Sequence, residues 1–201
     1  MTDSEHGSDH GRSGNRLPKS YFDAVYGDRL DPWGFESTWY EERKRAITLA
    51  ALPKARYERA FEPGCAIGVL TRELASRCDE VVAWDVHPAV VDECARRCAD
   101  VDHVDVTVGA IPDRWPAGRF DLVVLSEVAY YLDRNGLEAL AAHLRGSSAA
   151  NGTVVAVHWL GETDYPLTGT ETHERLEAEL AWTTVVHHVD EDFVLDVWER
   201  R

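Results

Sequence analysis

Residues 61–70 read FEPGCAIGVL, and this stretch decides the fold. An apolar run that ends at Phe61 is followed by the acidic Glu62 and then by a turn of small residues. Beyond Gly68 the sequence takes on helical character. A strand, a tight small-residue turn and a helix, in this order, bind nucleotide-like cofactors at the carboxyl end of a first parallel strand. The stretch therefore predicts an α/β protein built around such a cofactor.

A second apolar run, residues 81–84, ends in Asp85. An acidic side chain at the end of the second strand can accept hydrogen bonds from both hydroxyls of a ribose. The loop and the acid together indicate a cofactor that contains adenosine.

The rest of the chain alternates between strand and helix patterns. Strands are predicted near 58–62, 80–84, 103–108, 119–125 and 152–158, and helices over 18–26, 38–52, 67–77, 88–99, 135–146 and 170–181. Two final strands, 182–189 and 193–198, are separated by three residues and must form an antiparallel hairpin. This order is typical of a doubly wound, mostly parallel sheet. We expect one domain over residues 17–201, with an N-terminal helical cap over about 17–53.

The composition excludes several partners. With 201 residues and 44% hydrophobic residues, the chain suits one domain with a core. Its 21 basic and 36 acidic residues give a net charge of −15, which argues against nucleic acid and gives no support for an anionic membrane surface. No apolar run approaches the ~20 residues that span a bilayer.

The N-terminus and the cysteines indicate a cytoplasmic protein. Residues 1–16 are polar and are expected to be disordered, without a secretory signal or a metal site. The four cysteines follow no common zinc spacing, and reduced thiols are expected.

The loop spacing discriminates between adenosine cofactors. A dinucleotide loop needs G-x-G-x-x-G, so that the pyrophosphate lies on the helix N-terminus. Here Gly64, Ala66 and Gly68 are spaced two and two, and Glu62 precedes them. A carboxylate at that position would repel a pyrophosphate and would suit a cationic cofactor. S-adenosylmethionine carries an ammonium and a sulfonium and no phosphate, so it is the favoured cofactor.

Several motifs extend this interpretation to a family. They are DPWG at 31–34, WYE at 39–41, LAALP at 49–53, EPGCAIGVLT at 62–71 and FDLVVLSEVAYYL at 120–132. With them, the chain resembles class I S-adenosylmethionine-dependent methyltransferases, and among these the nodulation protein S family, over about residues 20–200. The resemblance implies a seven-stranded sheet with an antiparallel last strand. It also implies N-methylation of an amino sugar.

The resemblance, the small-residue loop and the aromatic residues of the N-terminal helical cap together give a set of expected cofactor-binding residues. They are Trp33, Tyr40, Arg43, Glu62, Gly64, Ala66, Gly68, Asp85, Val86, Ala110, Ile111 and Ser126. Arg43 or its neighbour Lys44 would pair with the cofactor carboxylate. Ala110 departs from the family pattern, because an acid that takes the adenine amino group is frequent at this position.

Glu127, Tyr130 and His158 are the expected catalytic residues. Glu127 and His158 are predicted at carboxyl ends of strands, where α/β sheets place ligands. Either could bind or deprotonate an ammonium acceptor, and Tyr130 could orient it. The plainer alternatives are a helix-capping carboxylate at Glu127 and a structural histidine at 158.

The residues leave the acceptor open. A small amine fits as well as an amino sugar, and an O-methyltransferase remains a competing hypothesis. So does a non-catalytic module that binds the cofactor without turnover. A nicotinamide-dependent oxidoreductase is disfavoured by the loop spacing.

Overall fold

A computed structural model describes residues 14–27 and 29–201 of the chain. Within this part the strands are β1 (Tyr57–Pro63), β2 (Cys78–Asp85), β3 (Val104–Val108), β4 (Phe120–Ser126), β5 (Ser148–Trp159), β6 (Thr183–Val189) and β7 (Phe193–Glu199). The helices are α1 (Lys19–Tyr26), α2 (Trp39–Ala51), α3 (Val69–Ala75), α4 (Pro88–Arg97), α5 (Arg134–Ser147) and α6 (Gly169–Leu180), with a short 3-10 turn, η1 (Ala129–Tyr131).

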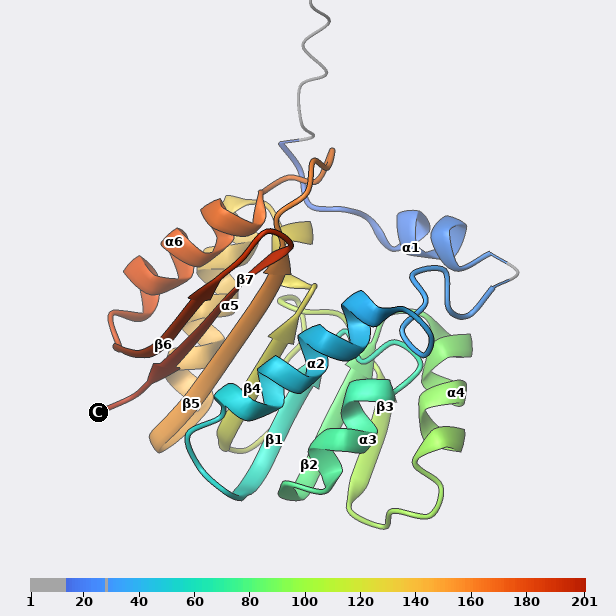
Figure 1. Cartoon of the computed structure of the whole chain (residues 1–201), viewed down its shortest axis with the longest axis horizontal. Helices are drawn as coiled ribbons and strands as arrows, with labels where there is room; N and C mark the ends of the chain where they lie inside the picture. Colours follow the sequence, from blue (N-terminus) through green and yellow to red (C-terminus); the bar gives the residue numbers. More distant parts are fainter. Residues whose placement is uncertain (1–13, 28) are drawn as a thin grey trace, which may run out of the picture.

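The seven strands of the described part form one sheet in the order β3-β2-β1-β4-β5-β7-β6. β1 to β5 run parallel, while β7 is antiparallel to both β5 and β6. The fold prediction is therefore confirmed, including the antiparallel last strand (Figure 1). The predicted elements agree with the structure to within a few residues, but η1 was not predicted, because three residues carry no periodicity.

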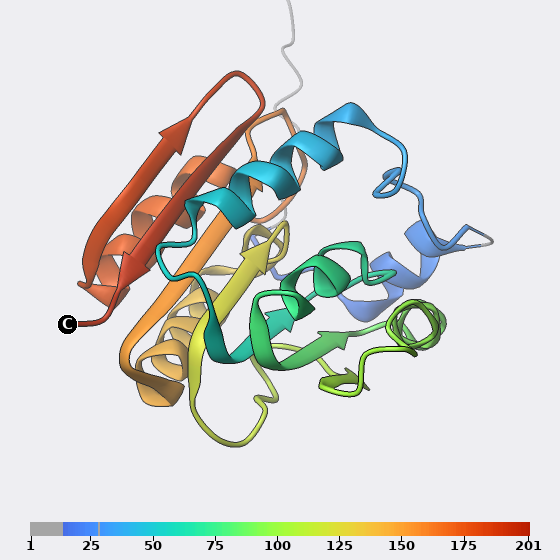
Figure 2. The ribbon, with the colours of Figure 1, turned by 60° about the horizontal axis from the view of Figure 1, so that its bottom comes forward.

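The sheet is buried on both faces because its central strands carry runs of consecutive apolar residues, such as 122–125 of β4. Leu122 and Val124 of β4 belong to a core cluster with α3, whereas Val123 and Leu125 pack in a cluster with α5 and α6. Side chains alternate between the two faces of a strand, so consecutive residues reach different layers. α2 and α3 lie on one side of the sheet and α5 and α6 on the other (Figures 1 and 2).

The N-terminal helices α1 and α2 cover part of the sheet. The Thr38 hydroxyl accepts a hydrogen bond from the Glu41 backbone and starts α2. Ile47 of α2 then packs on the core cluster shared by α3 and the sheet. α1 extends over the carboxyl end of the parallel strands (Figure 1). Of the expected disordered tail, residues 1–13 lie outside the described residues.

The strand order places a cleft between β1 and β4. The chain runs outward from β1 to β3 and then crosses back to β4, so successive connections leave these two strands in opposite directions. Ligands of open α/β sheets bind outside the carboxyl ends of the strands at such a switch point. Among the described helices, none has the length and apolar character needed to cross a membrane.

Candidate active site

The loop after β1 is held in a left-handed backbone conformation at every second residue. Gly64, Ala66 and Gly68 have φ angles of 76°, 47° and 80°. Glycine adopts such angles without steric cost, whereas Ala66 is strained. A Cβ on Gly68 would lie 2.5 Å from the Sγ of Cys94, so α3 and α4 can approach only past a glycine. The two-and-two spacing read from the sequence is thus a backbone requirement.

Asp85 ties this loop to the end of β2. Its Oδ2 accepts a hydrogen bond from the Ala66 backbone at 3.1 Å, and its Oδ1 accepts one from the His87 backbone at 3.0 Å. Burial raises the pKa of Asp85, against the effect of these backbone donors. A carboxylate can accept about four hydrogen bonds, so Asp85 keeps acceptor capacity for a ligand.

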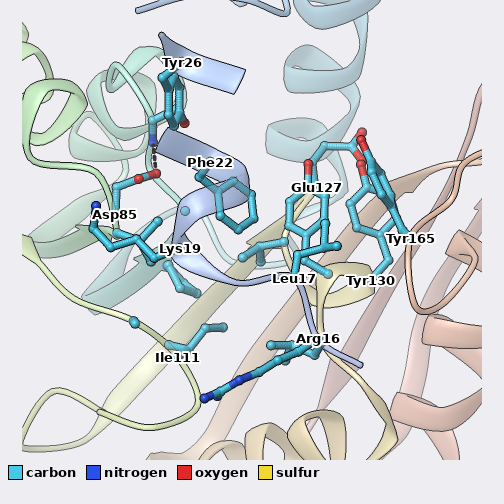
Figure 3. Close-up of a pocket in the computed structure, with 18 of the residues that line it drawn as sticks. Arg16, Leu17, Lys19, Phe22, Tyr26, Asp85, Ile111, Glu127, Tyr130 and Tyr165 are labelled. Atoms are coloured by element: carbon cyan, nitrogen blue, oxygen red, sulfur yellow. Dashed lines mark hydrogen bonds between the residues drawn. The ribbon is translucent and has the colours of Figure 1, made fainter. Parts of the chain in front are cut away.

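A cavity of about 710 Å³ lies over the carboxyl ends of the strands, within the usual size range of small-molecule sites. Asp85 and Glu127 line opposite sides of it (Figure 3). The walls between them are largely aromatic: Phe22, Tyr26, Trp33, Phe35, Tyr40, Tyr130, Tyr131, Trp159 and Tyr165 line the cavity. An aromatic wall between two acids suits a ligand with apolar faces and positive charge.

Glu127 forms the acidic side next to β4. Its backbone is left-handed, with a φ of 53°, and strain of this kind is found at functional sites. Its Oε1 accepts hydrogen bonds from the Tyr40 hydroxyl at 2.9 Å and from Lys44 Nζ at 2.8 Å. Its Oε2 accepts one from the Trp159 backbone at 3.0 Å. Lys44 Nζ also contacts Glu41 Oε1 at 2.8 Å, so one buried cation joins two carboxylates.

Three tyrosine rings pack together beside Glu127. The ring centroids of Tyr130, Tyr131 and Tyr165 lie 4.7–4.9 Å apart. Burial, followed by the charge of Glu127, raises the pKa of Tyr130 well above its ordinary value. Burial likewise raises the pKa of Tyr131 and Tyr165. These hydroxyls therefore stay protonated at neutral pH and can donate hydrogen bonds.

The segment before α1 lies across the cavity. The Leu17 backbone N–H donates to the Tyr131 carbonyl at 2.9 Å, and the Arg16 guanidinium pairs with Asp113 at 2.7 Å. Figure 3 shows Leu17 and Phe22 between the two acidic sides. These contacts, one with the segment after β3 and one with the segment after β4, hold residues 16–17 over the cavity.

The structure brings most of the sequence-predicted site residues together. Those that line the cavity are Trp33, Tyr40, Gly64, Ala66, Asp85, Val86, Ala110, Ile111, Glu127 and Tyr130. Arg43, Glu62, Gly68, Ser126 and His158 do not line it. Ser126 ends β4 directly before Glu127, and Gly68 starts α3 behind the loop.

Arg43 and Glu62 are directed away from the cavity. Arg43 forms ion pairs with Asp190 and Asp192 in the turn between β6 and β7. The Glu62 carboxyl, 2% exposed, accepts a hydrogen bond from the Thr71 hydroxyl at 2.6 Å behind the loop. Burial raises the pKa of Glu62 to about 8. An acid with this pKa is mostly protonated at neutral pH, so Glu62 brings little negative charge to the loop.

His158 is fully buried and lies behind η1. Its Nε2 accepts a hydrogen bond from the Ala129 backbone at 3.1 Å, and its Nδ1 contacts Nε2 of His173 at 2.9 Å. With both ring nitrogens occupied and the ring outside the cavity lining, His158 has no path to a ligand in this structure. The structural alternative for this histidine is the one that the geometry supports.

Sequence reasoning missed other parts of the cavity. Tyr165 comes from the irregular loop before α6, where no periodicity marks an inward side chain. Phe22 and Tyr26 lie on the helix predicted over residues 18–26, to which the sequence assigns no role. The aromatic residues of α1 and the tyrosine pair at 130–131 were the available signals.

The sheet order, the left-handed loop and the acid at the end of β2 define a Rossmann-like methyltransferase fold. The chain belongs to the Nodulation protein S (NodS) family, whose family model matches residues 26–150.

Similar proteins agree with this assignment. Nodulation protein S of Rhizobium tropici is 33% identical over 103 residues, which cover 51% of this chain and 43% of that protein. The crystal structure of a candidate methyltransferase from Pseudomonas syringae is 42% identical, with a TM-score of 0.73, and the match covers 81% of this chain and all of the other. N-methyltransferase NodS from Bradyrhizobium japonicum WM9, in complex with S-adenosyl-L-homocysteine, has a TM-score of 0.77 at 21% identity and shares the fold over 90% of this chain and 97% of that chain. The chain spans about half the length of the curated relatives it matches.

Replacement of Glu62 by Gln should flatten one part of the pH dependence of stability. The folded-state pKa near 8 is raised above the ordinary value of 4.5, so the stability linked to the neutral acid is complete below pH 4.5 and is lost as the pH rises through about 8. Glutamine keeps an acceptor for Thr71 and does not ionise. When urea unfolding is measured between pH 4 and about 9, the free energy of unfolding of the wild type should fall by a few kcal/mol relative to that of Glu62→Gln.

Glu58→Gln, at an exposed position on the same strand, serves as the control and should follow the wild type. Parallel curves for the wild type and Glu62→Gln would contradict the buried, protonated acid.

Lys44→Met should destabilise the chain strongly. It removes a cation, 1% exposed, that lies between the buried Glu41 and the part-buried Glu127, and it leaves both carboxylates without this ion pair. Loss of one partner in a buried ion pair costs about 3–5 kcal/mol. Lys54→Met removes a hydrogen bond to the Asn151 carbonyl at an exposed site and should cost less than about 1 kcal/mol. Equal losses in the two variants, measured by urea unfolding, would refute the role of Lys44.

Proposed function

We propose that this protein is an S-adenosylmethionine-dependent methyltransferase that methylates an amine nitrogen of a small molecule, amino sugars included. The observation that carries the proposal is one cavity with a ribose-type acid, Asp85, on one side and a part-buried acid among tyrosines, Glu127, on the other. The family assignment and the NodS structure described above support it.

The residues at the first side fit the cofactor. Gly64 and Ala66 line the cavity, and a Cβ on Gly64 would lie 3.2 Å from Val128. The loop therefore presents no side chain larger than a methyl group at these two positions. Asp85 would accept hydrogen bonds from the ribose hydroxyls. Ala110 and Ile111 would flank the adenine. When bound, S-adenosylmethionine supplies a methyl group already activated on a sulfonium.

The residues at the second side fit an amine. The Glu127 carboxylate would attract an ammonium group, and the faces of Tyr130 and Trp159 would add cation–π contacts. Nitrogen can attack only after the ammonium loses a proton, which Glu127 would accept. Leu17 and Phe22, which line the space between the two sides, would exclude water from it.

The remaining roles are indirect. Lys44 compensates the charge of Glu127, and Arg43 fixes α2 to the C-terminal hairpin. We place the protein in the cytoplasm, since its four cysteines are buried and free, as in a reducing compartment.

Calorimetric titration with S-adenosylhomocysteine tests the cofactor. The wild type should bind it with a dissociation constant in the micromolar range, and Asp85→Ala should weaken binding at least about ten-fold, since two charge-assisted hydrogen bonds are lost. Asp105→Ala, at an exposed position on β3, should bind as the wild type does. Absence of heat in the wild type would remove the methyltransferase proposal.

Mass spectrometry of an amine and amino-sugar panel, with isotope-labelled cofactor, tests the acceptor. Label should appear on nitrogen, and Glu127→Gln should lower kcat by about 100-fold with little change in cofactor affinity. Glu138→Gln, exposed on α5, is the matched control. Label found on oxygen alone would favour an O-methyltransferase, and cofactor binding without any transfer would favour a non-catalytic module.

A further inference from the structure

A buried row of side chains runs from the C-terminal hairpin to the edge of the cavity. His158 of β5, His173 of α6 and Asp196 of β7 are 0%, 4% and 5% exposed. His158 Nδ1 lies 2.9 Å from His173 Nε2, and His173 Nδ1 lies 2.5 Å from Asp196 Oδ2. The other oxygen of Asp196 accepts from Nδ1 of His187, whose side chain is 64% exposed. None of these residues lines the cavity.

The donor at the cavity end of the row, the Ala129 backbone N–H, indicates the direction of each hydrogen bond in it. The Ala129 backbone N–H can only donate, so the Nε2 of His158 that receives it must carry a lone pair. A neutral His158 then carries its proton on Nδ1 and donates to Nε2 of His173. His173 in turn carries its proton on Nδ1 and donates to Asp196.

The hydrogen bond between Ala129 and His158 holds the segment that forms the acceptor side of the cavity. Ala129 is fully buried and starts η1, two residues after the left-handed Glu127 and directly before Tyr130. The Tyr130 ring packs on the His158 ring at 4.9 Å between centroids. Without an acceptor at His158 Nε2, the buried Ala129 N–H would be unsatisfied, and the strained turn at Glu127 would lose a constraint.

We propose that His158, His173 and Asp196 are positioning residues: Asp196 and His173 hold His158 in the Nδ1–H tautomer, whose Nε2 fixes Ala129 and thereby orients Glu127 and Tyr130 toward the acceptor. The effect on turnover rests on the function proposed above, whereas the tautomer of His158 does not depend on it.

The surroundings of the row agree with a neutral His158 and an ionised Asp196. Burial, with His173 and Lys44 nearby, lowers the pKa of His158 well below its ordinary value. Burial opposes ionisation of Asp196, but hydrogen bonds from His173 and His187 keep its pKa below the ordinary value. A second proton on His173 would set two N–H groups against each other at the contact with His158.

Nitrogen-15 spectra of histidine-labelled, full-length protein measure the tautomer directly. The wild type should show His158 with its proton on Nδ1. His173→Phe removes the acceptor for that proton, so His158 should move toward the Nε2–H tautomer, and kcat should fall about ten-fold, as expected when a buried N–H loses its acceptor. Binding of S-adenosylhomocysteine should change less than about two-fold, because the cofactor side is not touched.

Two further variants separate positioning from packing. His173→Gln offers an amide oxygen to His158 Nδ1–H and should restore both the tautomer and most of kcat. His158→Gln places an amide oxygen near Ala129 without any tautomer, so adding His173→Phe to it should cause no further loss of kcat. His187→Ala, at the exposed end, leaves Asp196 bound to His173 and should retain the wild-type tautomer.

An Nε2–H tautomer of His158 in the wild type would overturn the proposal without any variant. So would a loss of kcat in His173→Phe that is the same in the His158→Gln background, because that result indicates packing alone. If no acceptor is methylated, the proposed function fails, and the spectra still decide the tautomer.

Discussion

The site depends on the two ion pairs that Lys44 forms with Glu41 and Glu127. Its ammonium, 1% exposed, lies between Glu41 on the same helix and Glu127 at the end of β4. A buried cation with two carboxylates is stable only when geometry and hydrogen bonds are satisfied together, and the Tyr40 hydroxyl completes the set. This cluster attaches α2 to the switch point of the sheet. The aromatic cap, and with it the wall of the cavity, therefore has a fixed position relative to the acid that it encloses.

The two sides of the cavity use the same physical device. Non-glycine residues with a left-handed backbone, Ala66 and Glu127, follow β1 and β4, the two strands at which the sheet order reverses. Each strained turn is held by a hydrogen bond from its own or a neighbouring backbone N–H to a buried side chain: Ala66 donates to Asp85, and Ala129 donates to His158. Strain of this kind persists only when the surrounding structure over-determines it. The buried polar groups behind the cavity thus set the shape of its floor.

Sequence patterns were sufficient to predict the sheet and its helices, since long apolar runs and small-residue turns are local signals. They predicted Asp85 and the loop after β1 at the cavity for the same reason. They could not choose between Arg43 and Lys44, because neighbours on a helix point about 100° apart and only tertiary packing decides which one faces the core. Tyr165 could not be predicted, because it lies in an irregular loop without periodicity. The partners of His158 could not be predicted either, because side chains from β5, α6 and β7 meet through contacts that no single segment encodes.

The charge of the buried cluster gives an argument about the ligand that is independent of any relative. Two carboxylates, Glu41 and Glu127, share one ammonium, so the fully ionised cluster carries a net negative charge beside the cavity. Burial raises the pKa of Glu41 in spite of Lys44, which shows that the environment resists this second negative charge. A cationic group in the cavity would relieve that resistance, and a phosphate or carboxylate would increase it. A ligand with a cationic group would therefore stabilise the cluster, as the proposed amine acceptor requires.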